Sequence, residues 1–291
     1  EQRARYLYRT VQGDDHVLVP MRGSTAPETA MLAARIAGAH DAAKVVLFEV
    51  VDDAAAARTE RSVSDDADGS EAAGDDGKGA ASRTARALEE HADRVRTKVG
   101  VPCEVLVAAS DGDEAAATLD AAREANCDLV VTPYETADGS LSSFVRGLFG
   151  GDIDVVAFHS VSGRTRWRRL LVPIAYTSTS AHSAAHAMVD YAQRLAAPTG
   201  TVSIATCIDE ESERRLAEST LADLAEMVRA AVETRVSRSD VTAFLRRNDA
   251  HYDLVFLGAS THRSTASRFL SRPTFERVGD LETDVAVVHV A

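Results

Sequence analysis

His16-Val-Leu-Val-Pro20 and Leu170-Leu-Val-Pro173 are two short apolar runs that end in Val-Pro, and each is followed by small and hydroxyl residues and then by a stretch with helical spacing. Short apolar runs of this kind, bounded by turn-forming residues, are typical of buried strands. The two runs therefore predict that the chain contains the same strand-helix unit twice.

The same order of elements continues after both runs. Residues 44–52 match 201–209, residues 127–132 match 252–257, and residues 154–159 match 284–289, all as apolar strands. Further strands are expected at 102–108 and 232–237, and helices at 27–40, 83–99, 113–124, 181–196, 211–228 and 240–247. Short Val/Leu/Ile strands that alternate with helices favour a mainly parallel sheet covered on both faces. We expect an α/β fold with two Rossmann-like domains, each a mainly parallel five-stranded sheet with helices on both faces.

Domain boundaries follow from the repeat. We expect a basic N-terminal segment at 1–14, a first domain at 15–162 and a second domain at 163–291. The first domain is longer because of residues 52–81, which are rich in Ala, Asp, Gly, Ser and Glu and hold few large apolar side chains. Such a segment cannot bury enough apolar surface to order itself, which predicts a disordered acidic loop.

Charge and composition limit the partners. The formal net charge is −13, and nearly all positive charge is arginine. An acidic, lysine-poor surface suits a halophilic cytoplasm, although a GC-rich genome that replaces Lys by Arg would give the same composition. A surface of this sign repels the phosphate backbone, so we expect no nucleic-acid partner. The three cysteines, Cys103, Cys127 and Cys207, form no C-x-x-C pair and are expected to be small buried residues.

The first nine residues contain three Arg and two Tyr. This composition is typical of the cytoplasmic side of a transmembrane helix, which favours attachment to a membrane protein; an ordinary frayed terminus explains it equally well. No apolar run approaches the roughly 20 residues of a membrane span. We therefore expect a soluble, cytoplasmic protein, with tethering to the membrane face as the alternative.

The order of elements, the Val-Pro at the end of the first strand and a glycine-containing loop after the fourth resemble universal stress protein domains, whose fold is the adenine nucleotide alpha hydrolase-like one. In nucleotide-binding members the first strand ends in Val-Pro-x-Asp-Gly-Ser, and the Asp helps to hold the nucleoside. Here the corresponding residues are Val19-Pro-Met-Arg-Gly-Ser24 and Val172-Pro-Ile-Ala-Tyr-Thr177, so both copies lack the carboxylate. The resemblance implies two degenerate nucleotide sites.

The family's second motif, G-x2-G-x9-G-(S/T), follows the fourth strand and cradles phosphates with backbone amides. In the first copy Pro133 removes an amide, and Glu135 and Asp138 would repel phosphate, so no nucleotide is expected there. The second copy keeps one glycine and several hydroxyl and Arg residues. The candidate nucleotide or anion site therefore consists of Gly258, Thr261, Arg263, Ser264 and Ser271; a polar loop without a ligand is the alternative.

Other motifs give little support for chemistry. The sequence has no P-loop, no G-x-G-x-x-G and no G-x-S-x-G, so no catalytic residue is assigned. His182 and His186 have zinc-ligand spacing but no third ligand nearby in sequence, so a surface helix face is expected rather than a metal site. Residues 163–169 carry four Arg and the single Trp; they are expected to connect the copies with Trp167 packed at the junction, and docking onto an acidic face is the alternative.

Together these features predict a non-catalytic regulatory or interaction module without a required cofactor. In the first version it is the cytoplasmic tail of a membrane transporter of the amino-acid or cation-chloride type, and its partner is the membrane domain of the same chain or another protein. In the second it is a free-standing tandem universal stress protein that binds ATP or another adenine nucleotide through the second copy. The resemblance also implies a homo-oligomer or an intramolecular pseudo-dimer, in which residues 154–159 and 284–289 pair with each other.

Overall fold

The computed structural model describes residues 16–22, 27–40, 42–51, 80–109, 112–138, 140–175, 179–196, 199–259, 278–279 and 281–291, without the side chains of 80–82 and 179–182. We call residues 16–162 the first half and 163–291 the second half. Thr261, Arg263, Ser264, Ser271, the predicted N-terminal segment 1–14 and nearly all of the predicted acidic loop lie outside the described residues.

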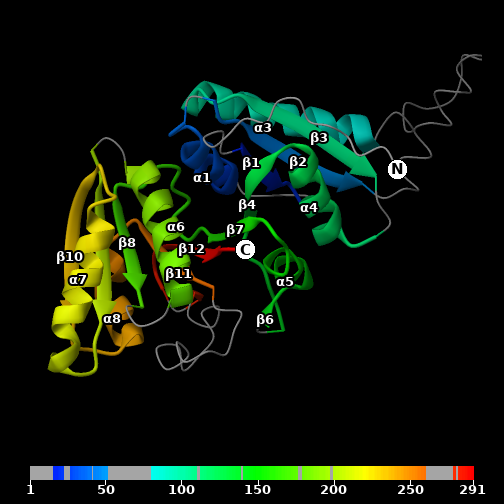
Figure 1. Ribbon diagram of the computed structural model, residues 1–291. Coiled ribbons are helices and arrows are strands. Elements are labelled where there is room, and N and C mark those ends of the chain that lie inside the picture. Colours follow the sequence, from blue (N-terminus) through cyan, green and yellow to red (C-terminus); the bar gives the residue numbers. More distant parts are fainter. Residues whose placement is uncertain are drawn as a thin grey trace, which may run out of the picture.

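Strands and helices alternate in both halves (Figure 1). The first half contains β1 (His16–Pro20), α1 (Pro27–Ala37), β2 (Val45–Val51), α3 (Ala80–Val99), β3 (Cys103–Ala109), α4 (Glu114–Glu124), β4 (Cys127–Pro133), the hairpin strands β5 (Thr136–Ala137) and β6 (Ser140–Leu141), α5 (Ser143–Phe149) and β7 (Asp154–His159). The second half contains β8 (Arg169–Ile174), α6 (Thr179–Ala196), β9 (Thr201–Cys207), η2 (Glu211–Glu213), α7 (Arg214–Ala225), β10 (Ala231–Ser237), α8 (Val241–Asn248), η3 (Asp249–His251), β11 (Leu254–Gly258) and β12 (Asp284–His289).

One ten-stranded sheet runs through the molecule in the order β10-β9-β8-β11-β12-β7-β4-β1-β2-β3. Each half contributes five parallel strands, and the order of the second half mirrors that of the first. The halves meet where β7 pairs antiparallel with β12, with Ala157 opposite Val287. The predicted pairing of these two strands is confirmed. Their β-branched, apolar side chains allow it because both faces of the sheet are covered at this point.

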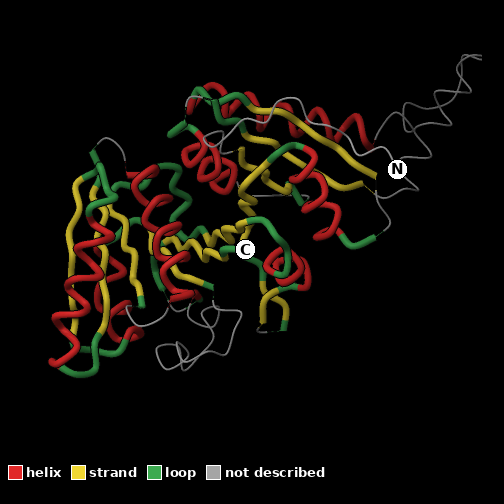
Figure 2. Tube along the Cα trace, in the orientation of Figure 1, coloured by secondary structure: helices red, strands yellow, loops and turns green. Residues whose placement is uncertain are grey.

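The helices form two layers, one on each face of the sheet (Figure 2). One core lies beneath α1, α3, α6 and α7, and the other beneath α4, α5 and α8. Both cores continue from one half into the other, so the antiparallel junction is packed on both faces. The predicted mainly parallel α/β fold with helices on both faces is confirmed.

Several helix boundaries differ from the prediction: α1 ends at Ala37 and not at residue 40, α6 begins two residues earlier, and α7 ends three residues earlier. The starts of α3 and α7 differ for identifiable reasons. Helix α3 begins at Ala80, so the predicted acidic loop ends two residues too late; alanine has the highest helix propensity and extends the helix toward its N-terminus. Helix α7 begins at Arg214 and not at Glu211, because the side chain of Glu213 accepts hydrogen bonds from the amides of Asp209 and Glu210 and closes a 3-10 turn first.

Among the described residues, no helix combines the length and the apolar character needed to cross a bilayer.

Candidate functional site

A cavity of about 390 Å³ lies at the carboxyl ends of β1 and β2, where ligands bind in open parallel sheets. It is bordered by the start of α4 and by α5, and its lining residues are Pro20, Arg22, Phe48, Glu49, Val50, Glu114, Thr118, Glu135 and Phe144. This is the position at which the resemblance implies a degenerate nucleotide site in the first half.

Arg22 occupies the sequence position of the family's Asp and forms ion pairs inside this cavity. Its Nε donates to Glu114 Oε2 at 2.8 Å, and its Nη1 donates to Glu135 Oε2 at 2.5 Å. The guanidinium carbon lies 4.2 Å from the ring centroid of Phe144, a cation-π distance. The guanidinium group therefore links the ends of three elements that are far apart in sequence.

The charge of the cavity disfavours phosphate. One arginine faces three glutamates, Glu49, Glu114 and Glu135, and two of these carboxylates already accept hydrogen bonds from that arginine. A nucleotide would bring further negative charge into a site that is already net negative. Coulomb repulsion in a partly buried site is screened less than at the surface.

The loop after β4 forms a hairpin in place of a phosphate-binding loop. Strands β5 and β6 pair antiparallel around Asp138, whose φ of 52° lies in the left-handed region. The next helix, α5, is capped by Ser142, whose Oγ accepts from the amide of Val145 at 3.2 Å. Ser142 Oγ also donates to Glu135 Oε2 at 3.4 Å, so the entry to α5 is tied to the Arg22 ion pairs.

In the second half, the structure describes only Gly258 of the five predicted nucleotide-site residues. Gly258 ends β11, and a Cβ there would lie 3.7 Å from Met188 Cε and 3.9 Å from Ala184 Cβ, which are ordinary contact distances. Neither packing nor a positive φ therefore requires glycine at this position. The predicted anion site stays a prediction.

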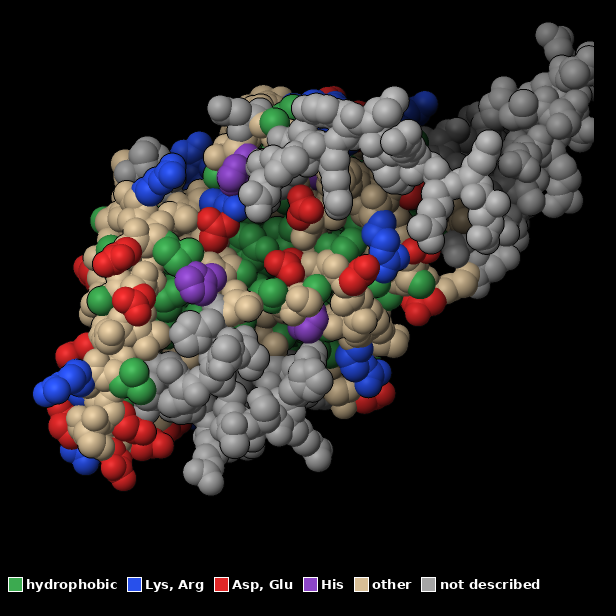
Figure 3. Space-filling model, viewed as in Figure 1, with side chains coloured by type: hydrophobic (Ala, Val, Ile, Leu, Met, Phe, Trp, Pro, Cys, Tyr) green, Lys and Arg blue, Asp and Glu red, His purple; other side chains and the backbone are tan. Residues whose placement is uncertain are grey.

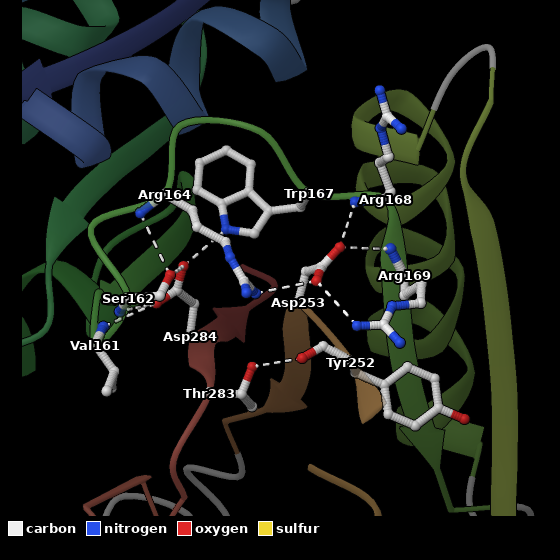
Figure 4. A network of polar contacts seen from close by, with 10 residues as sticks. All are labelled: Val161, Ser162, Arg164, Trp167, Arg168, Arg169, Tyr252, Asp253, Thr283 and Asp284. Atoms are coloured by element: carbon white, nitrogen blue, oxygen red, sulfur yellow. Dashed lines mark hydrogen bonds and ion pairs between the residues drawn. The ribbon is translucent and has the colours of Figure 1, made fainter. Parts of the chain in front are cut away.

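The junction between the halves contains a carboxylate network that is the most deeply buried one among the described residues (Figure 4). Asp284, at 0% exposure, begins β12 and accepts four hydrogen bonds. Its Oδ1 accepts from the amides of Val161 (2.8 Å) and Ser162 (2.9 Å), and its Oδ2 accepts from Ser162 Oγ (2.9 Å) and Trp167 Nε1 (2.8 Å). Trp167 is only 2% exposed and meets Phe158 of β7 edge-on at 5.6 Å. The prediction that Trp167 packs at the junction is confirmed.

Asp253 holds the adjoining arginines of the connector. Its Oδ2 accepts from the amides of Arg168 (2.9 Å) and Arg169 (3.0 Å), and its Oδ1 lies 3.0 Å from Arg164 Nη1. Burial raises the pKa of Asp253, but the two amides and the guanidinium groups of Arg164 and Arg169 outweigh burial, and its pKa lies below the ordinary value. The Arg-rich connector is thus anchored on the second half. Sequence reasoning missed Asp253 and Asp284; the signal was an Asp at or beside the first residue of the two apolar strands β11 and β12.

His289, at the other end of β12, packs across the same junction. It is 8% exposed, and its ring stacks on Phe149 of α5 with centroids 5.2 Å apart. Burial lowers the pKa of His289, while nearby Asp154 acts in the opposite direction. The folded protein therefore resists protonation of this ring.

Acid is expected to destabilise the fold through His289. The unfolded chain takes up a proton near pH 6.5 while folded His289 does not, so stability is unaffected well above pH 6.5 and falls as the pH drops below about 6.5. Urea midpoints at about pH 7.5 and 5.5 should differ less in His289→Gln than in the unmutated protein. His251→Gln, an exposed position in η3, is the control. An unchanged pH dependence in His289→Gln would contradict this expectation.

The described part of the chain contains no candidate metal site and no activated cysteine. No group of three or more His, Cys, Asp or Glu residues lies close enough to hold a metal there. His186 lies against Met227, while the side chain of His182 is outside the described residues. All three cysteines are buried, as predicted, and burial raises the pKa of Cys103 and Cys127 to about 12 and that of Cys207 to about 11. These thiols remain protonated and unreactive at neutral pH.

No family model and no curated protein matches the chain. Solved structures do. A universal stress protein from Archaeoglobus fulgidus DSM 4304 superposes with a TM-score of 0.60 at 15% identity, over 94% of this chain and 95% of that one. The cytoplasmic domain of a prokaryotic cation chloride cotransporter superposes with a TM-score of 0.56 at 12% identity, over 95% of this chain and 96% of that domain. The chain has the universal stress protein fold. At these identities the similarity establishes the fold alone.

Proposed function

We propose that this chain is a regulatory module that acts through binding and domain contacts rather than catalysis, and that it forms the cytoplasmic part of a membrane transporter of the amino-acid or cation-chloride type. The similarity to a cotransporter's cytoplasmic domain supports this proposal, because it covers nearly the whole of both chains.

The observation that carries the proposal is the Arg22 ion-pair cluster. A free-standing nucleotide-binding protein needs an open crevice with an acid for the nucleoside and amides for the phosphates. In this chain Arg22 replaces the acid, and its guanidinium group donates hydrogen bonds to the carboxylates of Glu114 and Glu135 and not to a ligand. These contacts disfavour a nucleotide in the first half, and the β7–β12 pairing joins this half to the second in one sheet, an arrangement that supports a role in domain contacts.

An antibody against this chain tests the attachment. If the proposal is right, immunoblots of the source cells detect a polypeptide much larger than 31.0 kDa that pellets with membranes and resists alkaline washing. Detection of a 31.0 kDa polypeptide in the supernatant alone would contradict it.

Calorimetry tests the absence of a nucleotide role. Titration of the chain with ATP and with AMP is expected to give no heat and no thermal stabilisation, since a bound ligand would raise the stability by mass action. Saturable binding of ATP that is lost in Arg263→Ala but kept in Arg22→Gln would instead support nucleotide binding by the second half.

A further inference from the structure

Strand β10 forms one outer edge of the ten-stranded sheet. It pairs along its whole length with β9 and with no other strand of the described chain, and Figure 1 shows it at the left margin of the molecule. Four of its seven residues, Ala231, Glu233, Thr234 and Arg235, are exposed. An edge strand of this length presents a row of backbone donors and acceptors on which another strand can add.

The sequence of β10 is complementary to itself when it is read in the opposite direction. In Ala231-Val-Glu-Thr-Arg-Val-Ser237, an antiparallel copy centred on Thr234 sets Glu233 opposite Arg235 and Val232 opposite Val236. Residues directly opposite each other in an antiparallel pair lie on the same face and interact. Two copies of β10 would therefore form opposite-charge pairs on one face of the sheet and apolar pairs on the other.

The side chains of β10 already lie on the faces that this pairing needs. On the face of α8, the Arg235 guanidinium lies 5.4 Å from the Phe244 ring centroid and donates to Asn248 Oδ1 at 3.0 Å. On the same face, Glu233 accepts a long hydrogen bond from Ser203 Oγ at 3.5 Å. Val232 and Val236 pack against the core on the face of α7.

Both charged groups keep bonding capacity for a partner. A guanidinium group has five N–H donors, and a carboxylate has about four lone-pair sites. The single hydrogen bonds to Asn248 and from Ser203 leave most of this capacity unused.

We propose that two copies of this chain associate through their β10 strands, antiparallel and about a twofold axis at Thr234, and so join two ten-stranded sheets into one. The interface is isologous: Glu233 of each copy meets Arg235 of the other, and the Val232 and Val236 side chains of the two copies meet beneath the α7 helices. A second copy fits because the required partner sequence is that of β10 itself.

Charge fixes the register of this pairing. Moving the axis to Glu233 would set two carboxylates opposite each other, and moving it to Arg235 would set two guanidinium groups opposite each other; both are destabilising. Only the axis at Thr234 gives two opposite-charge pairs. Figure 3 shows the face of the molecule on which α7 lies, the face of the proposed Val232 and Val236 contacts.

The opposite edge of the sheet, β3, lacks these properties. Arg96 from α3 donates to the Cys103 carbonyl from both Nε and Nη2, so part of the backbone is already bonded. The only charged side chain of β3, Glu104, pairs with Lys44 at 2.8 Å. Because these contacts engage the Cys103 carbonyl and the single charged side chain of β3, this edge is less suited to strand addition than β10.

Charge-reversal variants test the proposal by sedimentation velocity in about 0.15 M salt, where the Debye length of about 8 Å weakens repulsion between the acidic chains but spares contact pairs. The unmutated chain should show twice the 31.0 kDa mass of one copy. Glu233→Arg alone and Arg235→Glu alone should each weaken the dimer at least about tenfold, because both ion pairs become like-charge pairs.

Two rescues separate pairing from misfolding. The double variant Glu233→Arg/Arg235→Glu restores opposite charges within a homodimer, and an equimolar mixture of the two single variants restores them in a heterodimer; both should return to the dimer mass. Glu226→Arg, an exposed position just after α7 with the same charge change, should have no effect. A monomeric unmutated chain, a dimer that survives both single reversals, or the failure of both rescues would overturn the proposal.

Discussion

Replacing Asp284 with alanine is expected to lower the free energy of unfolding by about 3 to 5 kcal/mol, one of the two largest effects we expect from a single substitution. The fully buried carboxylate accepts hydrogen bonds from two amides, one hydroxyl and the indole of Trp167. Alanine would leave these donors without an acceptor, and a buried unsatisfied donor costs about 1 to 3 kcal/mol. Urea unfolding monitored by tryptophan fluorescence and circular dichroism would measure the change.

Asp154 provides the matched control because it begins β7 as Asp284 begins β12. Its carboxylate is less buried and accepts two longer hydrogen bonds, from Tyr191 Oη at 3.3 Å and from the Ala291 amide at 3.1 Å. Asp154→Ala should therefore cost only about 1 kcal/mol. Equal losses in the two variants would show that the donors around Asp284 find other partners, contrary to our expectation.

Much of the fold could be predicted from local sequence signals. Short apolar runs predicted the strands, and helical spacing predicted the helices. Asp113 and Asp240 were correctly expected at helix starts, where their side chains accept hydrogen bonds from backbone amides. The β5–β6 hairpin was missed although Asp138-Gly139, a typical hairpin turn, signals it. The resemblance instead predicts a degenerate phosphate loop at this place, where β5 and β6 pair.

The polar sites could not be predicted in the same way because their residues come from distant parts of the chain. Arg22 lies 92 residues from Glu114 and 113 from Glu135, and only the parallel sheet brings the three together. Sequence showed that the family's Asp is replaced by Arg22. It could not show that Arg22 would turn to two glutamates and the face of Phe144, since that depends on how α4 and α5 pack.

The buried polar network at the junction could not be predicted for the same reason, because its residues are distant in sequence. Trp167 was expected there as the single tryptophan of an Arg-rich connector, but its partner Asp284 is 117 residues away. A strand that begins with Asp usually leaves the carboxylate in water. Here residues 161–167, which run from the end of the first half into the connector, fold over the start of β12 and supply four donors. Burial of this charge therefore depends on the tertiary structure.

Replacing Trp167 with alanine is expected to cost about 3 to 5 kcal/mol, because a large buried ring leaves a cavity next to Phe158 and the connector loses its anchor. Trp167→Phe should cost less, since a ring still fills part of the space but the Nε1 donor to Asp284 is lost. The difference between the two variants separates packing from hydrogen bonding. Thermal and urea unfolding in a stabilising sulfate buffer would keep both variants measurable.

A double-mutant cycle decides whether Trp167 and Asp284 act as one unit. If the indole–carboxylate hydrogen bond links the connector to β12, then Trp167→Phe in an Asp284→Ala background should cost at least about 0.5 kcal/mol less than in the unmutated protein. The reason is that the donor removed by the second substitution has already lost its acceptor. Additive losses would mean that Trp167 stabilises the junction through its contact with Phe158 alone, and that Asp284 is held by Val161 and Ser162, which precede the connector.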